Sequence, residues 1–199
     1  DPAIEVVGLF TTLNQAFERV AMHGVRKQLL TEQAACVGLP LITIELPWPC
    51  SNEDYARIMT GFIADVVAQG IRHMAFGDLF LEDVRAYREQ QLAGTGIEPL
   101  FPLWGSNTRE LAPQMMAAGL KARISALDPN KLDASLGGHD FDEALLAALP
   151  EGVDPCGENG EFHTLAYDGP MFSRPLGIRV GETVLRDGFV FTDLLPIED

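Results

Sequence analysis

The first half of the chain alternates apolar, strand-like runs with helix-like segments. Residues 4–10 and 41–46 are apolar and rich in β-branched side chains, as in strands that are covered on both faces. The pattern between them predicts a helix over about 17–37, which Gly38 would end. The sequence therefore begins as a strand, a helix and a second strand.

A longer helix is predicted next, because Ser51 can cap it and an acidic residue, Asp54, lies three positions later. A third strand over about 71–76, a helix over about 82–93 and a short apolar piece over 97–103 follow. Within the longer helix, apolar residues recur at helical spacing and should form a stripe that faces the core: Tyr55, Ile58, Met59, Phe62, Ile63, Val66 and Val67.

Strand–helix alternation of this kind predicts an α/β fold, with right-handed crossovers and a doubly wound parallel sheet. Ligands of such sheets bind at the carboxyl ends of the strands. Thr11, Thr12, Gly77 and Asp78 directly follow predicted strands, so they are candidate binding residues.

The pattern changes in the middle of the chain. A helix over about 108–118, a strand over 121–127, a loop-like segment and a helix over 141–149 come first. We expect two domains, 1–104 and 105–199, the second smaller and of α+β type. The end of the chain alternates and carries turn signals, which predicts antiparallel strands at 162–168, 176–180 and 184–191, with turns at Gly181-Glu182 and Asp187-Gly188.

Composition limits the classes of partner. The 199 residues carry 29 acidic and 14 basic side chains, a formal net charge of −15, so nucleic acid and anionic membranes are unfavourable partners. No apolar run approaches the roughly 20 residues of a membrane span. Three cysteines, Cys36, Cys50 and Cys156, have no paired spacing, which favours a reducing cytoplasm over a disulfide framework. The sequence leaves the oligomeric state open, a homo-oligomer included.

The densest polar stretch runs from Asp154 to Thr164 and combines carboxylates, an amide, a histidine and a cysteine with two glycines. If the chain is extended from Glu161, then Glu161 and His163 share one face, because strand side chains repeat every two residues. Such a set of polar groups does not help to bury a core, which makes the stretch a candidate ligand-binding loop. A polar hairpin with a satisfied histidine is the plainer alternative. Cys156 is expected to be a small, semi-buried residue, since no base partner for a nucleophile can be named.

Several strings of the sequence occur together in one known family. They are, in order, Thr11-Thr12, Met22-His23-Gly24-Val25-Arg26, Pro47-Trp48-Pro49, Phe76-Gly77-Asp78, Glu98-Pro99-Leu100-Phe101-Pro102-Leu103-Trp104 and Gly157-Glu158-Asn159-Gly160-Glu161-Phe162-His163-Thr164. With these strings, essentially the whole chain resembles the diphthine–ammonia ligase-like branch of the PP-loop ATP pyrophosphatases. The last string is the most specific part of the resemblance.

The resemblance implies a HUP-like nucleotide-binding domain followed by a substrate domain. Members of the family bind ATP, with Mg²⁺, and activate a carboxylate as an acyl-adenylate with release of pyrophosphate. Ammonia then attacks to give the amide. The carboxylate is diphthine, the modified histidine of elongation factor 2, in the founding activity, and other branches are linked to amidations such as corrinoid salvage. The implied substrates are therefore ATP, ammonia and a small-molecule or protein-borne carboxylate.

One motif of the family does not occur in the sequence. The phosphate-binding loop of Ser-Gly-Gly-Lys-Asp-Ser type should precede the strand at 4–10, where its backbone amides would cradle the pyrophosphate. The chain opens almost directly on that strand and without a methionine, so we expect a longer protein with roughly 25 further residues, the size of one βα unit. The alternative is a true truncation, which should neither fold well nor bind ATP.

In the first domain the resemblance assigns nucleotide contacts to six residues: Phe10, Thr11, Thr12, His23, Gly77 and Asp78. The two threonines could equally be ordinary ends of a strand. Asp78 is a candidate catalytic residue that binds Mg²⁺ or orients the amine, or else it is the N-cap of the next helix. Arg26 is expected at the surface.

In the second domain the resemblance assigns substrate contacts to seven residues of the polar stretch: Gly157, Glu158, Asn159, Gly160, Glu161, His163 and Thr164. Glu161 is the second catalytic candidate, and none of these seven residues is assigned to a protein-held metal. The alternatives are a metal-dependent hydrolase with Glu158, Glu161 and His163 as ligands and a non-catalytic nucleotide-binding module. In the preferred interpretation Thr12, Asp78 and these three residues should line one continuous pocket.

Overall fold

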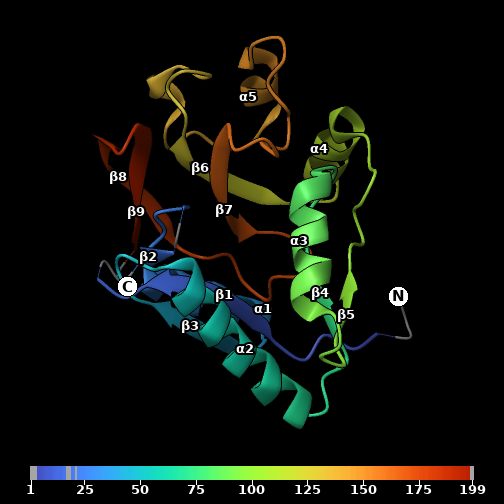
Figure 1. The fold of residues 1–199 in the computed structure, drawn as a ribbon. Coiled ribbons are helices and arrows are strands. Elements are labelled where there is room, and N and C mark those ends of the chain that lie inside the picture. The colour runs from blue at the N-terminus through green and yellow to red at the C-terminus, as the bar shows by residue number, and fades with distance from the viewer. Residues whose placement is uncertain (1–3, 17–18, 21, 198–199) are drawn as a thin grey trace.

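The structure, a computed structural model, describes residues 4–16, 19–20 and 22–197. Its strands form three sheets: a three-stranded and a two-stranded sheet from the first half of the chain, and a four-stranded sheet from the second half (Figure 1). Within the described ranges, none of the helices has the length and apolar character that a membrane crossing requires.

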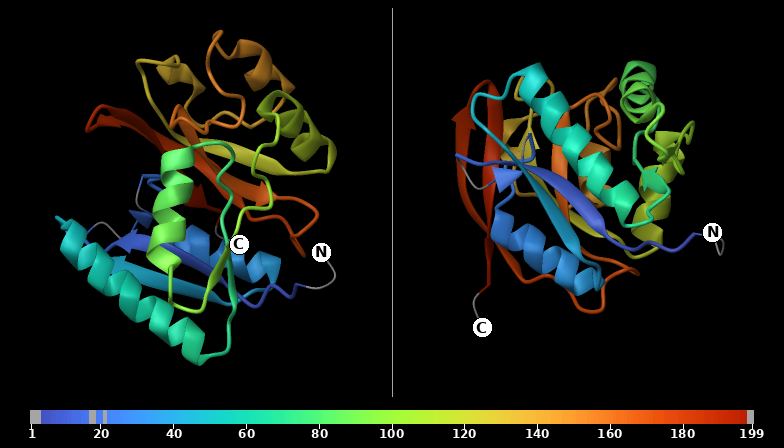
Figure 2. Two further views of the ribbon diagram at one scale, coloured as in Figure 1. Left: turned by 45° about the vertical axis from the view of Figure 1, so that its right-hand side comes forward. Right: turned by 60° about the horizontal axis from the view of Figure 1, so that its bottom comes forward.

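The first sheet has β1 (Leu9–Asn14) at its centre. The parallel strand β3 (Leu41–Leu46) pairs with all of β1, and the short antiparallel strand β2 (Arg19–Val20) pairs with its last two residues. The helices α1 (Lys27–Val37) and α2 (Asn52–Ala68) cover opposite sides of this sheet (Figure 2). This arrangement is the doubly wound pattern that the sequence predicts, on a small scale.

The second sheet is the parallel pair β4 (His73–Ala75) and β5 (Glu98–Leu100), which α3 (Glu82–Leu92) connects. The third sheet is antiparallel and has the order β7-β6-β9-β8. Its elements, with the short helices beside it, are α4 (Thr108–Ala117), β6 (Lys121–Leu127), η1 (Ala134–Leu136), α5 (Glu143–Ala148), β7 (Phe162–Asp168), β8 (Ile178–Arg186) and β9 (Phe189–Pro196).

One apolar core joins the two halves of the chain. It combines buried residues around α1 with buried residues of the four-stranded sheet and the segment before β8: Val25, Leu29, Cys36, Leu165, Leu176 and Leu194. Burying an apolar side chain of this size stabilises the folded state by roughly 1.5–3 kcal/mol. The first sheet and the four-stranded sheet are therefore held together by packing as well as by the chain.

Several predictions of elements are confirmed. The strands expected at 121–127 and 162–168 have these bounds in the structure. Ser51 Oγ accepts a hydrogen bond from the Asp54 N–H at the start of α2, and Gly38 ends α1 in the left-handed conformation with φ 78°. Local turn and capping chemistry therefore determines these boundaries.

Two predictions near the N-terminus are wrong in their bounds. No strand forms over residues 4–8, and the first strand instead runs from Leu9 to Asn14, so Thr11 and Thr12 lie inside it and not beyond its end. The helix expected over 17–37 begins only at Lys27; residues 17, 18 and 21 lie outside the described residues. The described part of 19–26 is a hairpin, because the Val20 N–H donates to the Val25 carbonyl and β2 pairs with β1.

The single HUP-like parallel sheet is also not formed by the described residues. Two parallel pairs exist locally, β1 with β3 and β4 with β5, but β1 and β4 belong to different sheets. Aromatic side chains lie between them: the ring centroid of Phe10 is 5.2 Å from that of Phe62 and 6.4 Å from that of Phe76. Side-chain packing, and not strand pairing, therefore connects the two parallel units.

At the other end of the chain, Gly181-Glu182 is not a turn. β8 continues through it with a shift of register between Val180 and Thr183. A Cβ on Gly181 would lie 2.9 Å from Leu195 Cδ1, so the glycine allows the two strands to approach closely. The predicted turn at Asp187-Gly188 is confirmed: it joins β8 to β9, and both residues have positive φ.

Candidate functional site

A cavity of about 230 Å³ lies between the first two sheets. Its walls come from β1, α2, β4 and α3, and the lining residues are Phe10, Thr11, Thr12, Tyr55, Met59, Ile63, Met74, Phe76, Tyr87, Arg88, Gln91 and Leu92. Drug-sized ligand pockets measure roughly 300–1,000 Å³. The cavity is therefore large enough for one end of such a ligand, for instance the nucleoside part of a nucleotide.

The lining of the cavity is mainly apolar and aromatic, with a few polar groups. Phe10 and Phe76 contribute aromatic surface, of which the Phe76 ring already contacts Phe101 and Arg88, and Thr11 and Thr12 are the polar residues of the β1 wall. Burial and the neighbouring Tyr87 raise the pKa of Tyr55, so its phenol stays protonated and can donate a hydrogen bond. Such a lining suits a planar ligand with polar substituents.

Arg88 supplies the one charged side chain among the described lining residues. Its Nε donates to Asp78 Oδ2 at 2.9 Å, and its guanidinium carbon lies 4.5 Å from the ring centroid of Phe76. Asp78 does not cap α3, because that helix starts at Glu82 and its N-cap position, Leu81, makes no side-chain cap. The N-cap interpretation of Asp78 is therefore wrong, and its carboxylate holds Arg88.

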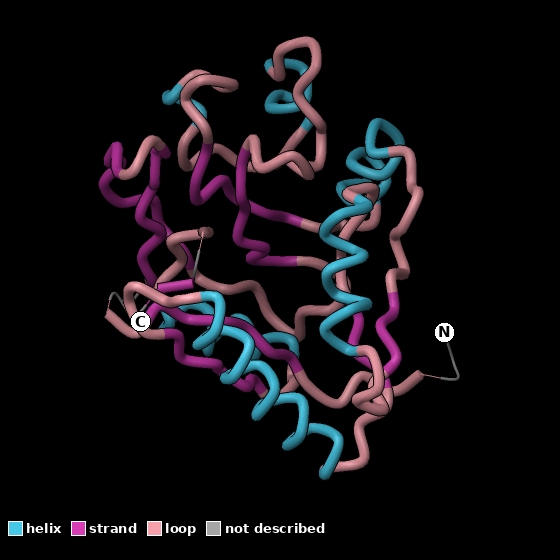
Figure 3. The backbone as a smooth tube through the Cα atoms, in the orientation of Figure 1, coloured by secondary structure: helices cyan, strands magenta, loops and turns pink. Residues whose placement is uncertain are grey.

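The polar loop, residues 154–164, follows α5 and includes the first residues of β7. Its part before β7 is drawn in pink in Figure 3, and two buried carboxylates organise it. Asp154 Oδ2 accepts hydrogen bonds from the backbone N–H groups of Cys156 at 3.1 Å and Glu158 at 2.9 Å. Glu161 Oε1 accepts from the Asp154 N–H at 3.2 Å and from the Asn159 side-chain amide at 3.0 Å. Asp154 is 8% exposed and Glu161 only 2%. Both carboxylates therefore point into the loop.

Electrostatics keep Glu161 ionised inside this loop. Burial raises its pKa, but the hydrogen bonds and the nearby Lys131 outweigh burial, and the net pKa is lowered. Its second oxygen, Oε2, has no hydrogen-bond partner in the described part of the chain. Burial, with Asp154 and Glu158, raises the pKa of Cys156 to about 12, so this thiol stays protonated and is not a nucleophile.

The loop reaches the end of the second sheet through Glu158. Its Oε1 accepts a hydrogen bond of 2.7 Å from the backbone N–H of Leu79, the residue that follows Asp78. Gly157 permits this path, since its φ is 70° and a Cβ there would lie 2.7 Å from the Phe162 carbonyl oxygen. The sequence-predicted residues Gly77, Asp78 and Glu158 thus belong to one neighbourhood.

A second junction is formed by two histidines from distant parts of the sequence. The ring centroids of His23 and His163 lie 4.4 Å apart. Burial lowers the pKa of His23, against a hydrogen bond to the backbone of Thr164, and burial and His23 together lower the pKa of His163 to about 4. Both imidazoles are therefore neutral near pH 7.

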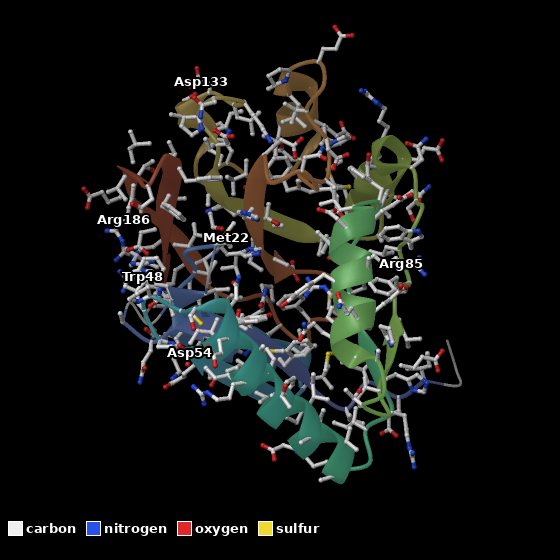
Figure 4. The ribbon with its side chains drawn as sticks, in the orientation of Figure 1. Met22, Trp48, Asp54, Arg85, Asp133 and Arg186 are labelled. Atoms are coloured by element: carbon white, nitrogen blue, oxygen red, sulfur yellow. The ribbon has the colours of Figure 1, made fainter. Side chains whose placement is uncertain are left out.

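The hairpin that carries His23 is anchored on β9. Asp193 binds Arg19 at 3.0 Å and forms two hydrogen bonds with Arg26, at 2.9 and 2.6 Å. Gly24 has φ 66°, and a Cβ on it would lie 2.7 Å from the Phe191 ring. Met22, labelled in Figure 4, is exposed and also has a positive φ of 67°. Arg26 is partly exposed, as expected, yet it fixes the hairpin.

The expected single pocket is thus divided. Phe10, Thr11 and Thr12 line the cavity, whereas Asp78, Glu158, Glu161 and His163 do not. The Glu158 side chain accepts a hydrogen bond from the Leu79 N–H, and the Glu161 side chain accepts one from the Asp154 N–H. The His163 ring contacts the His23 ring. In the described ranges, no group of three or more His, Cys, Asp and Glu side chains is arranged to hold a metal ion.

Sequence reasoning missed the residues of α2 and α3 that line the cavity. Tyr55, Met59 and Ile63 belong to the stripe that was assigned wholly to the core, and Val67 of that stripe is 38% exposed. Arg88 could have been found from its position, because it lies on the helix that follows the Gly77-Asp78 strand end.

Comparisons with known proteins decide the family. A family model, the diphthamide synthase C-terminal domain, matches residues 107–193. The diphthine–ammonia ligase of Danio rerio is 32% identical over 177 residues, which cover 79% of this chain and 68% of the relative. This chain belongs to the diphthine–ammonia ligase family. The enzymes of that name from Rattus norvegicus and Homo sapiens are 29% identical over 128 residues and 32% identical over 103 residues.

The match to these family members is partial. It covers 61% of this chain and 47% of the rat enzyme, and 48% of this chain and 38% of the human enzyme. The chain therefore spans less than half the length of these mammalian relatives. The loop with Glu158, Glu161 and His163 lies inside the region that the family model matches.

Proposed function

We propose that this protein is an ATP-dependent amide ligase that activates a carboxylate by adenylation and transfers it to ammonia. Membership in the diphthine–ammonia ligase family supports the ligase class. The cavity with Phe10, Phe76 and Arg88 supports binding of a nucleotide, because it combines an aromatic lining with one cation.

The observation that carries the proposal is the position of the polar loop. Through Glu158 it contacts Leu79 beside the cavity-forming strand β4, and through His163 it contacts the hairpin after β1. A loop that meets both sequence segments next to the cavity can present a substrate carboxylate to a nucleotide held there. Adenylation needs such proximity, since reacting atoms must approach to about 3–3.5 Å.

The chemistry that we propose uses no covalent bond to the protein. An oxygen of the substrate carboxylate attacks the α-phosphorus of ATP, and pyrophosphate leaves. The nitrogen of ammonia then forms a bond to the activated carbonyl carbon, the bond to AMP breaks, and one proton is released. The contribution of the chain is orientation and stabilisation of charge, in agreement with the protonated thiol of Cys156.

The residues described fit Mg²⁺ less well than they fit a nucleoside. Asp78, the sequence-predicted ligand, is engaged by Arg88, and the described side chains provide no cluster of carboxylates and histidines for a metal. We therefore assign no step to a protein-bound metal. The same geometry disfavours a hydrolase with Glu158, Glu161 and His163 as metal ligands.

A pyrophosphate-release assay tests the proposal, with ammonia and a set of carboxylates that includes a diphthine peptide and a corrinoid acid. Release should depend on the carboxylate, and hydroxylamine in place of ammonia should trap the activated acid as a hydroxamate. Carboxylate-independent hydrolysis of ATP, with no amide and no hydroxamate, would contradict an amide ligase. Binding of ATP without turnover would favour a non-catalytic nucleotide-binding module.

A further inference from the structure

The strand β3 is the outermost strand of the first sheet and has unpaired backbone groups (Figure 1). The carbonyl oxygens of Pro40 and Leu46 accept hydrogen bonds from the N–H groups of Leu9 and Gln15, on the β1 side. Successive residues of a strand direct their backbone groups to opposite sides, so every second residue from Leu41 to Glu45 points its N–H and C=O away from β1. Within the described ranges, no strand and no other backbone group pairs with this side of β3.

The βα unit that we expect before β1 would not cover this edge. In the doubly wound order 3-2-1-4 the first strand is central and the third strand is the edge. With one βα unit before them, β1 and β3 take the second and third places. The free edge of β3 therefore follows from the order of the strands and not from how much of the protein the chain spans.

The edge strand of the third sheet, β8, differs from β3 in the features that prevent edge pairing. β8 carries Arg179, Glu182 and Arg186 and has a shift of register in its middle. Charged side chains and bulges of this kind hinder a second strand from joining an edge. β3 pairs with β1 without a shift, and its one charged residue, Glu45, is held by Lys27 of α1 at 3.1 Å. Of the two edges, β3 is therefore the one suited to pairing.

An antiparallel pairing of β3 with a second copy of itself satisfies the unpaired groups. When Thr43 lies opposite the partner's Thr43, Leu41 lies opposite the partner's Glu45. These three residues are the ones whose backbone groups point outward. Residues that lie opposite each other in such a pair exchange both of their N–H···O bonds. Each outward N–H of one copy then meets an outward C=O of the other.

The sequence next to β3 disfavours the neighbouring registers. A shift by two residues in one direction brings Pro47 opposite Leu41, and proline has no N–H. A shift in the other direction brings Leu39 opposite Glu45, but the Leu39 N–H already donates to the Ala34 carbonyl at 3.2 Å. The register centred on Thr43 is therefore the one that uses all the outward donors.

We propose that β3 pairs antiparallel with β3 of a second copy of this chain, about a two-fold axis at Thr43, so that one sheet continues across a dimer. The same surface is used by both copies, as a two-fold interface requires. On the face that packs against α2, Ile42 lies opposite the partner's Ile44, and such cross-strand pairs of β-branched residues stabilise a sheet. The inference goes beyond the proposed ligase activity, because β3 contributes no residue to the cavity or to the polar loop.

Sedimentation equilibrium of the purified protein tests the inference. The wild type should form a species of twice the 21.7 kDa of one chain. The copies share the net charge of −15, so the measurement is made at physiological salt, which screens charges beyond roughly 8 Å. Thr43→Pro removes a donor that points away from β1, and an edge strand tolerates such a proline. The dissociation constant of the dimer should rise at least about tenfold, because two hydrogen bonds across the axis are lost.

A matched pair of variants, Thr43→Lys and Leu185→Lys, adds the same charge to the two edge strands. Leu185 is 71% exposed on β8. Thr43→Lys should raise the dissociation constant, because two like charges then lie opposite each other. Leu185→Lys should leave it within about twofold. Far-UV circular dichroism checks the fold of each variant, and if Thr43→Pro does not fold, Thr43→Lys takes its place.

Amide hydrogen exchange followed by NMR gives a second readout. In the wild-type dimer the N–H groups of Leu41, Thr43 and Glu45 should be protected, and in Thr43→Lys those of Leu41 and Glu45 should exchange rapidly. The N–H groups of Ile42 and Ile44 point toward β1 and should be protected in both proteins.

Three results would overturn the inference. The first is a wild-type protein that stays monomeric at every concentration tested. The second is a dimer whose dissociation constant is the same in the Thr43 variants as in the wild type, or rises equally in Leu185→Lys. The third is protection of the outward N–H groups in a monomer, because another part of the chain would then cover the edge.

Discussion

The polar loop 154–164 and the cavity beside β1 are both candidate ligand sites, yet they are built in opposite ways. In the loop, neighbouring residues bond to one another: Glu161 holds Asp154, and Asp154 holds Glu158. In the cavity, residues from four elements, as far apart as Phe10 and Arg88, face a shared space. The polar residues of the loop are neighbours in sequence and form most of their hydrogen bonds with one another. The residues that line the cavity are far apart in sequence and face a space that is open to a ligand.

This difference changes the meaning of the carboxylates in the loop. A buried carboxylate that accepts several hydrogen bonds gives the loop its shape, and its loss leaves donors unpaired. Glu158 is the member whose side chain leaves the loop, toward Leu79. We therefore expect the carboxylates of the loop to maintain its shape, and the residues that line the cavity to contact a ligand directly.

The largest effect should follow from Glu161→Ala. The change removes the acceptor for the Asp154 N–H and for Asn159 inside a buried site, so we expect the free energy of unfolding to fall by about 3 kcal/mol. Urea denaturation at pH 7 measures it. The control on the cavity is Gln91→Ala, for which we expect a change below about 0.5 kcal/mol. Similar losses in the two variants would remove the distinction between loop and cavity.

A smaller loss of stability should follow acidification, because the two histidines at the junction between the loop and the hairpin then become protonated. The pKa of His163 is about 4 in the folded protein and that of His23 is also lowered, whereas an unfolded histidine titrates near 6.5. Between these values the unfolded state binds more protons, so stability is lost as pH falls from about 6.5 to about 4. We expect a loss of about 2 kcal/mol between pH 7 and pH 5.

Denaturation at several pH values checks this expectation. The variant His163→Gln should lose much of the pH dependence in that window, and the exposed His139→Gln should retain it. A slope that is unchanged in His163→Gln would show that the two rings do not carry the effect.

Much of the fold was predictable from the sequence because local signals determine it. The strands at 121–127 and 162–168, the Ser51 cap and the Gly38 helix end all depend on neighbours in sequence. The hairpin before α1 was not predictable in this way. Its conformation depends on pairing with β1 and on Asp193, which lies 174 positions beyond Arg19.

The site was predictable in its parts but not in its assembly. Thr11, Thr12, His23 and the polar loop were identified as candidates, and the contact of His23 with His163 joins two of the strings that carry the family resemblance. Side-chain direction could not be read from the sequence. Glu161 was expected to face a ligand, yet it accepts from Asp154 and is 2% exposed.

The central claim is that a nucleotide binds in the cavity between β1 and β4. Photo-crosslinking with ATP that carries an azide on the adenine base, followed by peptide mass spectrometry, tests it most directly. The account predicts labels in residues 9–14, 55–63 or 74–92, and loss of these labels with excess unmodified ATP. Labels confined to the groove along α1, which Arg19, Arg26 and Lys27 line, would contradict it.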